Sequence, residues 1–174
     1  MNCGIVLTGD TDQASAVAFY DDGEVTVSDA ASNDDIVALV AEKGPTVVAL
    51  NAPPKRSRAT DFREGEEELI DDGHAMLPQG MRDQAVLERA DHLARSIQAA
   101  GTGTTIIESN ARLAGDILGL EGDADLEDHG IGTGDITSTR QYDAVVLAIV
   151  ADLYADNRCE DHGIVVPEDD VTTI

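Results

Sequence analysis

The chain has 174 residues, of which 35 are acidic and 11 are lysine or arginine, so its formal net charge is −24. Hydrophobic residues make up 42% of the chain, which excludes wholesale disorder, and the longest apolar run, Ala144 to Ala151, is too short to cross a bilayer. The first residues, MNCGIVLTGD, lack the pattern of a secretory signal, so we expect a cytoplasmic protein, not associated with membranes, with reduced thiols at Cys3 and Cys159.

The acidic residues are spread over every segment, lysine occurs only twice, and large aromatic residues are scarce. This pattern is typical of adaptation to high salt, where a Debye length of roughly 3 Å screens the repulsion between surface charges. We therefore interpret acidic runs such as Asp21-Asp22, Asp34-Asp35 and Glu66–Glu68 as solvated surface and not as metal ligands.

The first part of the chain predicts three antiparallel strands, a helix and a buried strand. CGIVLTG forms the first strand, and the next two strand-like runs flank the turn signal Asp21-Asp22-Gly23. Ser32 to Asp35 is a helix-capping sequence, and that helix ends near Lys43-Gly44-Pro45. PTVVALN then follows as an apolar strand.

The segment from Ala52 to about Gln79 is polar and loop-rich, with one short acidic helix expected around Asp61 to Asp71. The elements expected after it are, in chain order, a helix from Met81 to Ala100, a strand in TTIIESN, a helix in ARLAGDILGL, a loop in EGDADLEDHGIGTGD, a helix from Gln141 to Asn157 and a short strand in GIVVP. Apolar strands that alternate with helices predict an α/β fold with helices on both faces of the sheet. We expect one domain over residues 1–174, with a loop-rich insertion at about 52–80.

Polar residues end two of the apolar strands: Asn51 ends VVALN and Glu108 ends TIIE. Ligands collect at the carboxyl ends of parallel strands, so both side chains are candidates for a site at one rim of the sheet. The alternative is that each side chain only marks where the chain leaves the sheet for solvent.

Asp143 stands near the start of a helix whose next eight residues carry no charge. One interpretation is a carboxylate that caps the helix N-terminus, where the helix dipole favours negative charge. The other is an acid that points from a buried helix toward the same rim as Glu108.

Four of the eleven basic residues, Lys55, Arg56, Arg58 and Arg63, lie within nine positions directly after the strand that ends at Asn51. Such a cluster suits phosphate oxygens of a nucleotide or a nucleic acid, or it neutralises the acidic helix that follows. His74, in the same loop-rich segment, is either a substrate contact or a solvent-exposed histidine.

Several pieces, taken in order, resemble an uncharacterised family of predicted nucleases with a ribonuclease-H-like fold: CGIVLTG, VVALNAPP, GHAMLPQGM, TIIESNARLAGDILGL, YDAVVLAIVADLYADN and GIVVP. The resemblance implies a core of three antiparallel strands, a helix and further strands and helices. It also implies carboxylates around one or two Mg²⁺ or Mn²⁺ ions, which activate water for phosphodiester hydrolysis. Glu108 and Asp143 match the family's acidic positions, whereas Val6 and Asn51 stand where the family usually has aspartate.

Two functions are open at this point. The first is a divalent-metal-dependent nuclease, with Glu108 and Asp143 as metal ligands, Asn51 as a neutral ligand or water-positioning group, and the basic cluster on the phosphates. The second is a ribonuclease-H-like protein that has lost hydrolysis and serves as a binding or scaffolding module. The expected partner is a nucleic acid or a nucleotide, and both a monomer and a homodimer are open.

Overall fold

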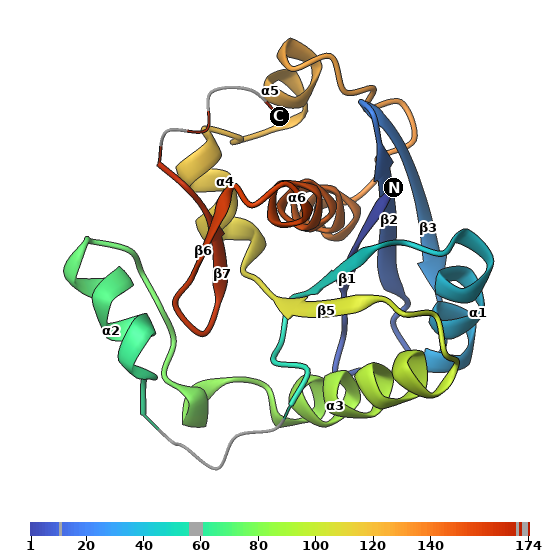
Figure 1. Cartoon of the computed structure of the whole chain (residues 1–174), viewed down its shortest axis with the longest axis horizontal. Helices are drawn as coiled ribbons and strands as arrows, with labels where there is room; N and C mark the ends of the chain where they lie inside the picture. Colours follow the sequence, from blue (N-terminus) through green and yellow to red (C-terminus); the bar gives the residue numbers. More distant parts are fainter. Residues whose placement is uncertain (11, 56–60, 170, 172–173) are drawn as a thin grey trace.

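The computed structural model describes residues 1–10, 12–55, 61–169, 171 and 174. A five-stranded mixed sheet lies at its centre, in the order β3-β2-β1-β4-β5 (Figure 1). The strands are β1 (Asn2–Val6), β2 (Ser15–Asp21), β3 (Glu24–Ala30), β4 (Val47–Leu50) and β5 (Thr105–Glu108). β1, β2 and β3 pair antiparallel, whereas β4 runs parallel to both β1 and β5. The predicted α/β class with a mixed sheet is therefore confirmed.

The local signals of the N-terminal region act as predicted. Asp22 and Gly23 both have positive φ, 50° and 83°, as a tight hairpin turn requires. Ser32 caps α1 (Asn33–Lys43): its hydroxyl accepts a hydrogen bond from the Asp35 backbone N–H, and the Asp35 carboxylate accepts one from the Ser32 N–H. The helix ends at Gly44, which is left-handed.

One face of the sheet is covered by α6 (Thr139–Ala155), whose side chains from Ala144 to Ala151 are all buried (Figure 1). The helix backbone rests directly on β1 at Gly4. A Cβ atom added there would stand 2.1 Å from the Ala144 carbonyl oxygen and 2.3 Å from the Ala148 nitrogen. Because glycine has no side chain, β1 and α6 can pack at this distance.

The other face is covered by α1 and α3 (Gln84–Ala99) (Figure 1). Arg89 of α3 connects these layers: its Nε donates to Asn33 Oδ1 at 2.8 Å, and its Nη1 donates to the Thr8 carbonyl oxygen at 3.0 Å. One guanidinium thus ties α3 to the start of α1 and to the chain just after β1.

The loop-rich insertion contains α2 (Glu64–Asp71) and a short 3-10 helix, η1 (Gln79–Met81). It is followed, after α3 and β5, by α4 (Ala111–Leu118), which the sequence predicted. No helix within the described ranges is long and apolar enough to cross a membrane.

The expected loop after α4 is wrong, because α5 (Asp123–Asp128) forms within it. The Asp125 carboxylate accepts hydrogen bonds from the backbone N–H groups of Glu121 and Gly122, and Leu126 is buried in the core beside α6. A single apolar residue in an acidic stretch is too weak a pattern to predict a helix, and the core contact supplies the missing stabilisation.

The C-terminal strand β7 (Val165–Pro167) lies outside the five-stranded sheet. It pairs antiparallel with β6 (Cys159–Asp161), a strand that the sequence analysis missed. An isolated parallel bridge from Val165 to Ser109 joins this hairpin to the end of β5. Cys3 and Cys159 are both free thiols, as expected.

Replacement of Gly4 by alanine tests the contact between β1 and α6. We expect Gly4→Ala to lower the free energy of unfolding by about 3 kcal/mol, because backbone atoms of α6 cannot move aside as a flexible side chain would. Urea titration in molar KCl measures it. Gly132→Ala is the matched control, since nothing lies within 4 Å of its added Cβ. Equal stability of the two variants would show that α6 does not depend on this approach.

Candidate functional site

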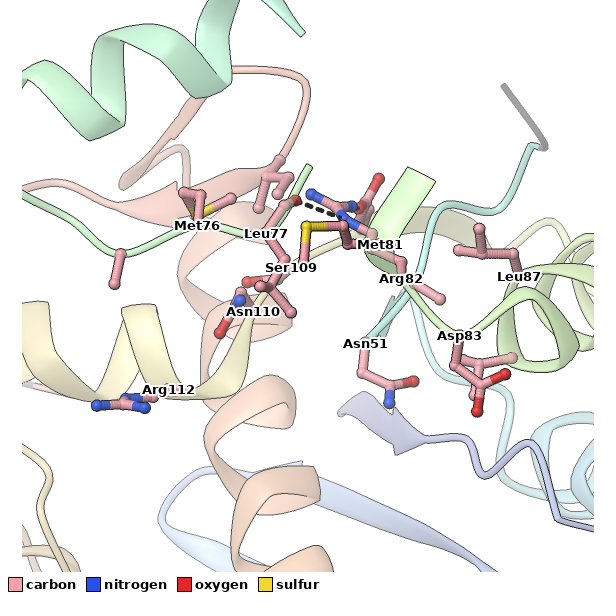
Figure 2. A pocket seen from close by; sticks show the side chains of 15 residues that line it. Asn51, Met76, Leu77, Met81, Arg82, Asp83, Leu87, Ser109, Asn110 and Arg112 are labelled. Atoms are coloured by element: carbon pink, nitrogen blue, oxygen red, sulfur yellow. Dashed lines mark hydrogen bonds and ion pairs between the residues drawn. The ribbon is translucent and has the colours of Figure 1, made fainter. Parts of the chain in front are cut away.

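A pocket of about 450 Å³ lies at the carboxyl ends of β4 and β5 (Figure 2). Asn51, directly after β4, and Glu108, the last residue of β5, both line it. The other walls come from η1, the residues before it, and the starts of α3 and α4. The structure therefore brings two of the predicted site residues to one rim.

Glu108 is 7% exposed, and both of its carboxylate oxygens are held by arginine. Oε2 accepts from Arg63 Nη1 at 2.8 Å, and Oε1 accepts from Arg63 Nη2 at 3.0 Å and from Arg82 Nη1 at 2.9 Å. Burial raises the pKa of this carboxyl, the two guanidinium groups oppose that effect, and the net pKa lies above the ordinary value.

Glu66 of α2 completes a charge quartet, by which we mean Arg63, Glu66, Arg82 and Glu108. Its Oε1 accepts from Arg63 Nη2 at 2.6 Å and from Arg82 Nη2 at 2.5 Å, and its Oε2 accepts from the Arg63 backbone N–H at 2.8 Å. Burial alone would raise the pKa of Glu66, but its hydrogen bonds with Arg63 and the charge of Arg82 outweigh burial and lower it.

The quartet corrects one interpretation of the sequence and bears on another, for Arg63 alone. Glu66 is not solvated surface, because its exposed fraction is 0%. Arg63 does neutralise the following acidic helix, as one alternative held, and it also reaches across to β5. Two positive and two negative charges cancel within the quartet, which fastens α2 and the residue after η1 to the end of β5.

Asn51 uses both ends of its amide to join two strand ends. Its Oδ1 accepts from the Leu7 backbone N–H at 2.9 Å, and its Nδ2 donates to the Leu7 carbonyl oxygen at 3.2 Å. These two hydrogen bonds, which we call the amide clamp, join the residues just beyond the paired ends of β1 and β4. An aspartate could accept the first bond but could not donate the second.

Asp143 is the fifth residue of α6, and the helix cap lies earlier in the chain. Ser138 Oγ accepts a hydrogen bond from the Gln141 backbone N–H, so the capping interpretation of Asp143 does not hold. The Asp143 side chain is half-buried, and burial raises its pKa. Val6, where the resemblance implied an acid, packs against the same core as α6.

The donor set does not fit a divalent cation. Mg²⁺ and Mn²⁺ need several free oxygen ligands, preferably carboxylates. Glu108 holds two arginines, Asn51 holds Leu7, and Val6 offers no donor. In the part of the chain that the structure describes, no three His, Cys, Asp or Glu residues are grouped so that they could hold a metal ion.

The predicted phosphate-binding cluster is only partly placed. Lys55 and Arg63 line a shallow hollow of about 290 Å³ along β5, while Arg56 and Arg58 lie outside the described residues. His74 is half-buried just after α2, where its backbone N–H donates to the Leu69 carbonyl oxygen at 3.0 Å.

The residues predicted from the sequence for this site do not include Glu66, Arg82, Ser109 or Arg112. For the two arginines a signal existed. The chain has 11 basic residues against 35 acidic ones, so each arginine outside the basic cluster of residues 55–63 is a candidate for a charge with a specific partner or function. For Glu66 and Ser109 no local pattern distinguishes them from their neighbours.

A second polar contact holds α2 against the β6-β7 hairpin, beside it in Figure 1. His162 Nδ1 lies 3.1 Å from Glu68 Oε2, and His162 Nε2 lies 3.0 Å from Glu160 Oε2. Burial alone would lower the pKa of this imidazole, but the two carboxylates outweigh burial and raise it above its ordinary value.

No family model matches the chain, and no curated protein matches it. Two solved structures of RuvC from Thermus thermophilus are similar in shape, one of them in complex with Holliday junction substrate. Each is 11% identical, and each alignment covers 95% of this chain and 98% of the RuvC chain, with TM-scores of 0.49 and 0.48. Identity and superposition are both too low for this likeness to carry an argument about the chemistry of the chain.

Glu66→Gln tests the charge quartet. We expect the free energy of unfolding to fall by about 3 kcal/mol, because two largely buried guanidinium groups lose a carboxylate partner. Chemical unfolding in molar KCl measures the loss. Glu67→Gln, the exposed neighbour on α2, is the control and should change stability little. A Glu66→Gln protein as stable as the control would mean that the quartet contributes nothing to the fold.

His162 predicts a pH dependence with a defined sign. A raised pKa in the folded state means that the charged imidazole stabilises the fold fully below the unfolded pKa of about 6.5, and that this contribution is lost as the pH rises through the folded pKa. The Tm of the natural protein should therefore exceed that of His162→Gln at mildly acid pH, and the difference should shrink as the pH rises. Thermal unfolding followed from pH 6 upward checks this, and a constant difference contradicts it.

Proposed function

We propose that this chain is a binding protein of ribonuclease-H-like fold that does not hydrolyse phosphodiesters. The order of elements supports the fold: three antiparallel strands, a helix, and two parallel strands with helices between and after them. The same order is what the family resemblance implies. The pocket at the ends of β4 and β5 is the proposed place of binding.

One observation carries the loss of hydrolysis: both oxygens of Glu108 are engaged by Arg63 and Arg82. A cation that replaced them would have to displace three charge-assisted hydrogen bonds in a buried setting. It would also leave Arg63 and Arg82 with only Glu66 as a partner in the quartet. Since breaking a buried ion pair is expensive, Glu108 favours arginine over a metal ion.

The other positions of the expected acidic set support the same conclusion. Hydrolysis by bound metal ions requires acids that converge from separate elements on the same ion. Val6 supplies an apolar side chain, and the amide of Asn51 is committed to Leu7. Asp143 alone remains with no assigned role.

A titration with Mn²⁺ tests the proposal. We expect no saturable binding by calorimetry in molar KCl, and no Mn²⁺-dependent cleavage of RNA, single-stranded DNA or duplex DNA. The variants Glu108→Gln and Asp143→Asn should give the same calorimetric trace as the natural protein. Saturable binding that is lost in both variants, with cleavage by the natural protein, would establish the metal-dependent nuclease instead.

A second test places aspartate at the two positions where the family resemblance implies an acid. Val6→Asp combined with Asn51→Asp recreates the two missing acids, and we expect this variant, if folded, to remain without Mn²⁺-dependent cleavage because the quartet still holds Glu108. Circular dichroism checks the fold. Cleavage by the double variant would show that Glu108 is released when a metal ion binds.

A further inference from the structure

We propose that the pocket binds a small organic anion, a molecule with an apolar body and one carboxylate or phosphate group. The apolar body packs on the side chains of Met76, Leu77 and Met81, and the anionic group lies at the start of α4 beside Arg112. This inference rests on the proposed function, because it takes Glu108 as an ion-pair partner and not as a metal ligand.

The apolar side of the pocket exposes large hydrophobic side chains to solvent. Leu77 is 58% exposed and Met81 is 71% exposed, and among the described residues Met1 is the only other large apolar side chain classed as exposed. Both residues belong to the pocket wall, together with Met76 and the buried Leu87. Thioether side chains adapt to ligands of irregular shape, so this wall suits an apolar body that covers it.

The wall is also held in place. Arg82 Nε donates to the Leu77 carbonyl oxygen at 3.2 Å, while the other end of the same guanidinium is fixed by the quartet. The open rim is therefore attached to a buried ion-pair network, which keeps Leu77 at the mouth of the pocket.

The opposite side of the pocket carries an unneutralised charge. In Figure 2, Asn110 and Arg112 lie on one side of the pocket, and Asn51 and Asp83 lie on the other. Arg112 is exposed at the second position of α4, and within the described ranges its guanidinium makes no hydrogen bond or ion pair. The helix dipole disfavours a cation at a helix N-terminus. An anion bound there is favoured by the helix dipole and by the positive charge of Arg112.

Ser109 is an independent observation at the same end. It is 2% exposed, it lines the pocket, and its hydroxyl finds no hydrogen-bond partner among the residues that the structure describes. Buried hydroxyl groups are almost always paired, so the unpaired hydroxyl of Ser109 suits a ligand oxygen that accepts a hydrogen bond from it.

The remaining charges of the pocket set the ligand's charge. Arg82 and Glu108 neutralise each other within the quartet, and the Asp83 carboxylate caps α3 by accepting from the Ala85 N–H at 2.9 Å. Asp83 keeps its negative charge but lies on the other side of the pocket from Arg112 (Figure 2), so Arg112 is the one described cation of the lining outside the quartet. A single guanidinium and a volume of about 450 Å³ suit one small molecule with a single anionic group and not a backbone of successive phosphates.

The test uses anilinonaphthalene sulfonate, a fluorescent anion with an apolar body, titrated into the full chain in molar KCl. We expect saturable binding that Arg112→Gln weakens about tenfold, equivalent to about 1.4 kcal/mol. Arg95→Gln, which removes an exposed arginine of α3 outside this pocket, should bind as the natural protein does. Leu77→Ser with Met81→Ser should also weaken binding, and circular dichroism confirms that each variant is folded.

Competition then separates the two anionic groups. Benzoate and phenyl phosphate should displace the probe, the better competitor identifying the natural group, whereas neutral benzyl alcohol should not at the same concentrations. The inference is overturned if the probe does not bind, if Arg112→Gln and Arg95→Gln bind equally well, or if benzyl alcohol competes as well as the anions. Those outcomes leave the Mn²⁺ titration unaffected, while saturable Mn²⁺ binding at Glu108 would reject the proposed function whatever the probe does.

Discussion

The buried ion-pair network of two glutamates and two arginines determines how the pocket at the ends of β4 and β5 is built. Arg63 and Arg82 each contact both Glu66 and Glu108, so three separate stretches of chain meet in one network. Without the arginines, two carboxylates would be buried near one another at the end of β5. With them, the polar loop-rich insertion becomes a fixed wall of the pocket.

The same quartet explains why an acid in the position of a metal ligand does not behave as one. A carboxylate at the end of a buried strand must be paired with a cation, because an isolated charge in this setting is costly. A metal ion or a guanidinium can both serve. In this chain Arg63 of the insertion and Arg82, directly after η1, supply two guanidinium groups. Asn51 joins the neighbouring strand end to Leu7 through its neutral amide.

Burial also decides which charges matter in a chain of net charge −24. Exposed ion pairs are strongly screened in concentrated salt, whereas buried pairs are screened much less. The many surface carboxylates therefore contribute mainly to solvation. The quartet and the Arg89 contacts between α1 and α3 are charges whose positions are specific enough to shape the fold.

The sequence by itself determined the α/β class, the hairpin turn at Asp22-Gly23 and the capped helix from Asn33, because turn residues, caps and apolar periodicity act over a few neighbouring positions. It also determined the buried helix predicted from Gln141 to Asn157, which the structure has over Thr139–Ala155. It also placed Asn51 and Glu108 at one rim, because parallel strands end on the same side. Only the tertiary structure decided that Glu66 is buried, that Arg82 lies 2.9 Å from Glu108, and that α5 forms around Leu126. Each of these depends on residues far apart in the chain, whose approach no local pattern encodes.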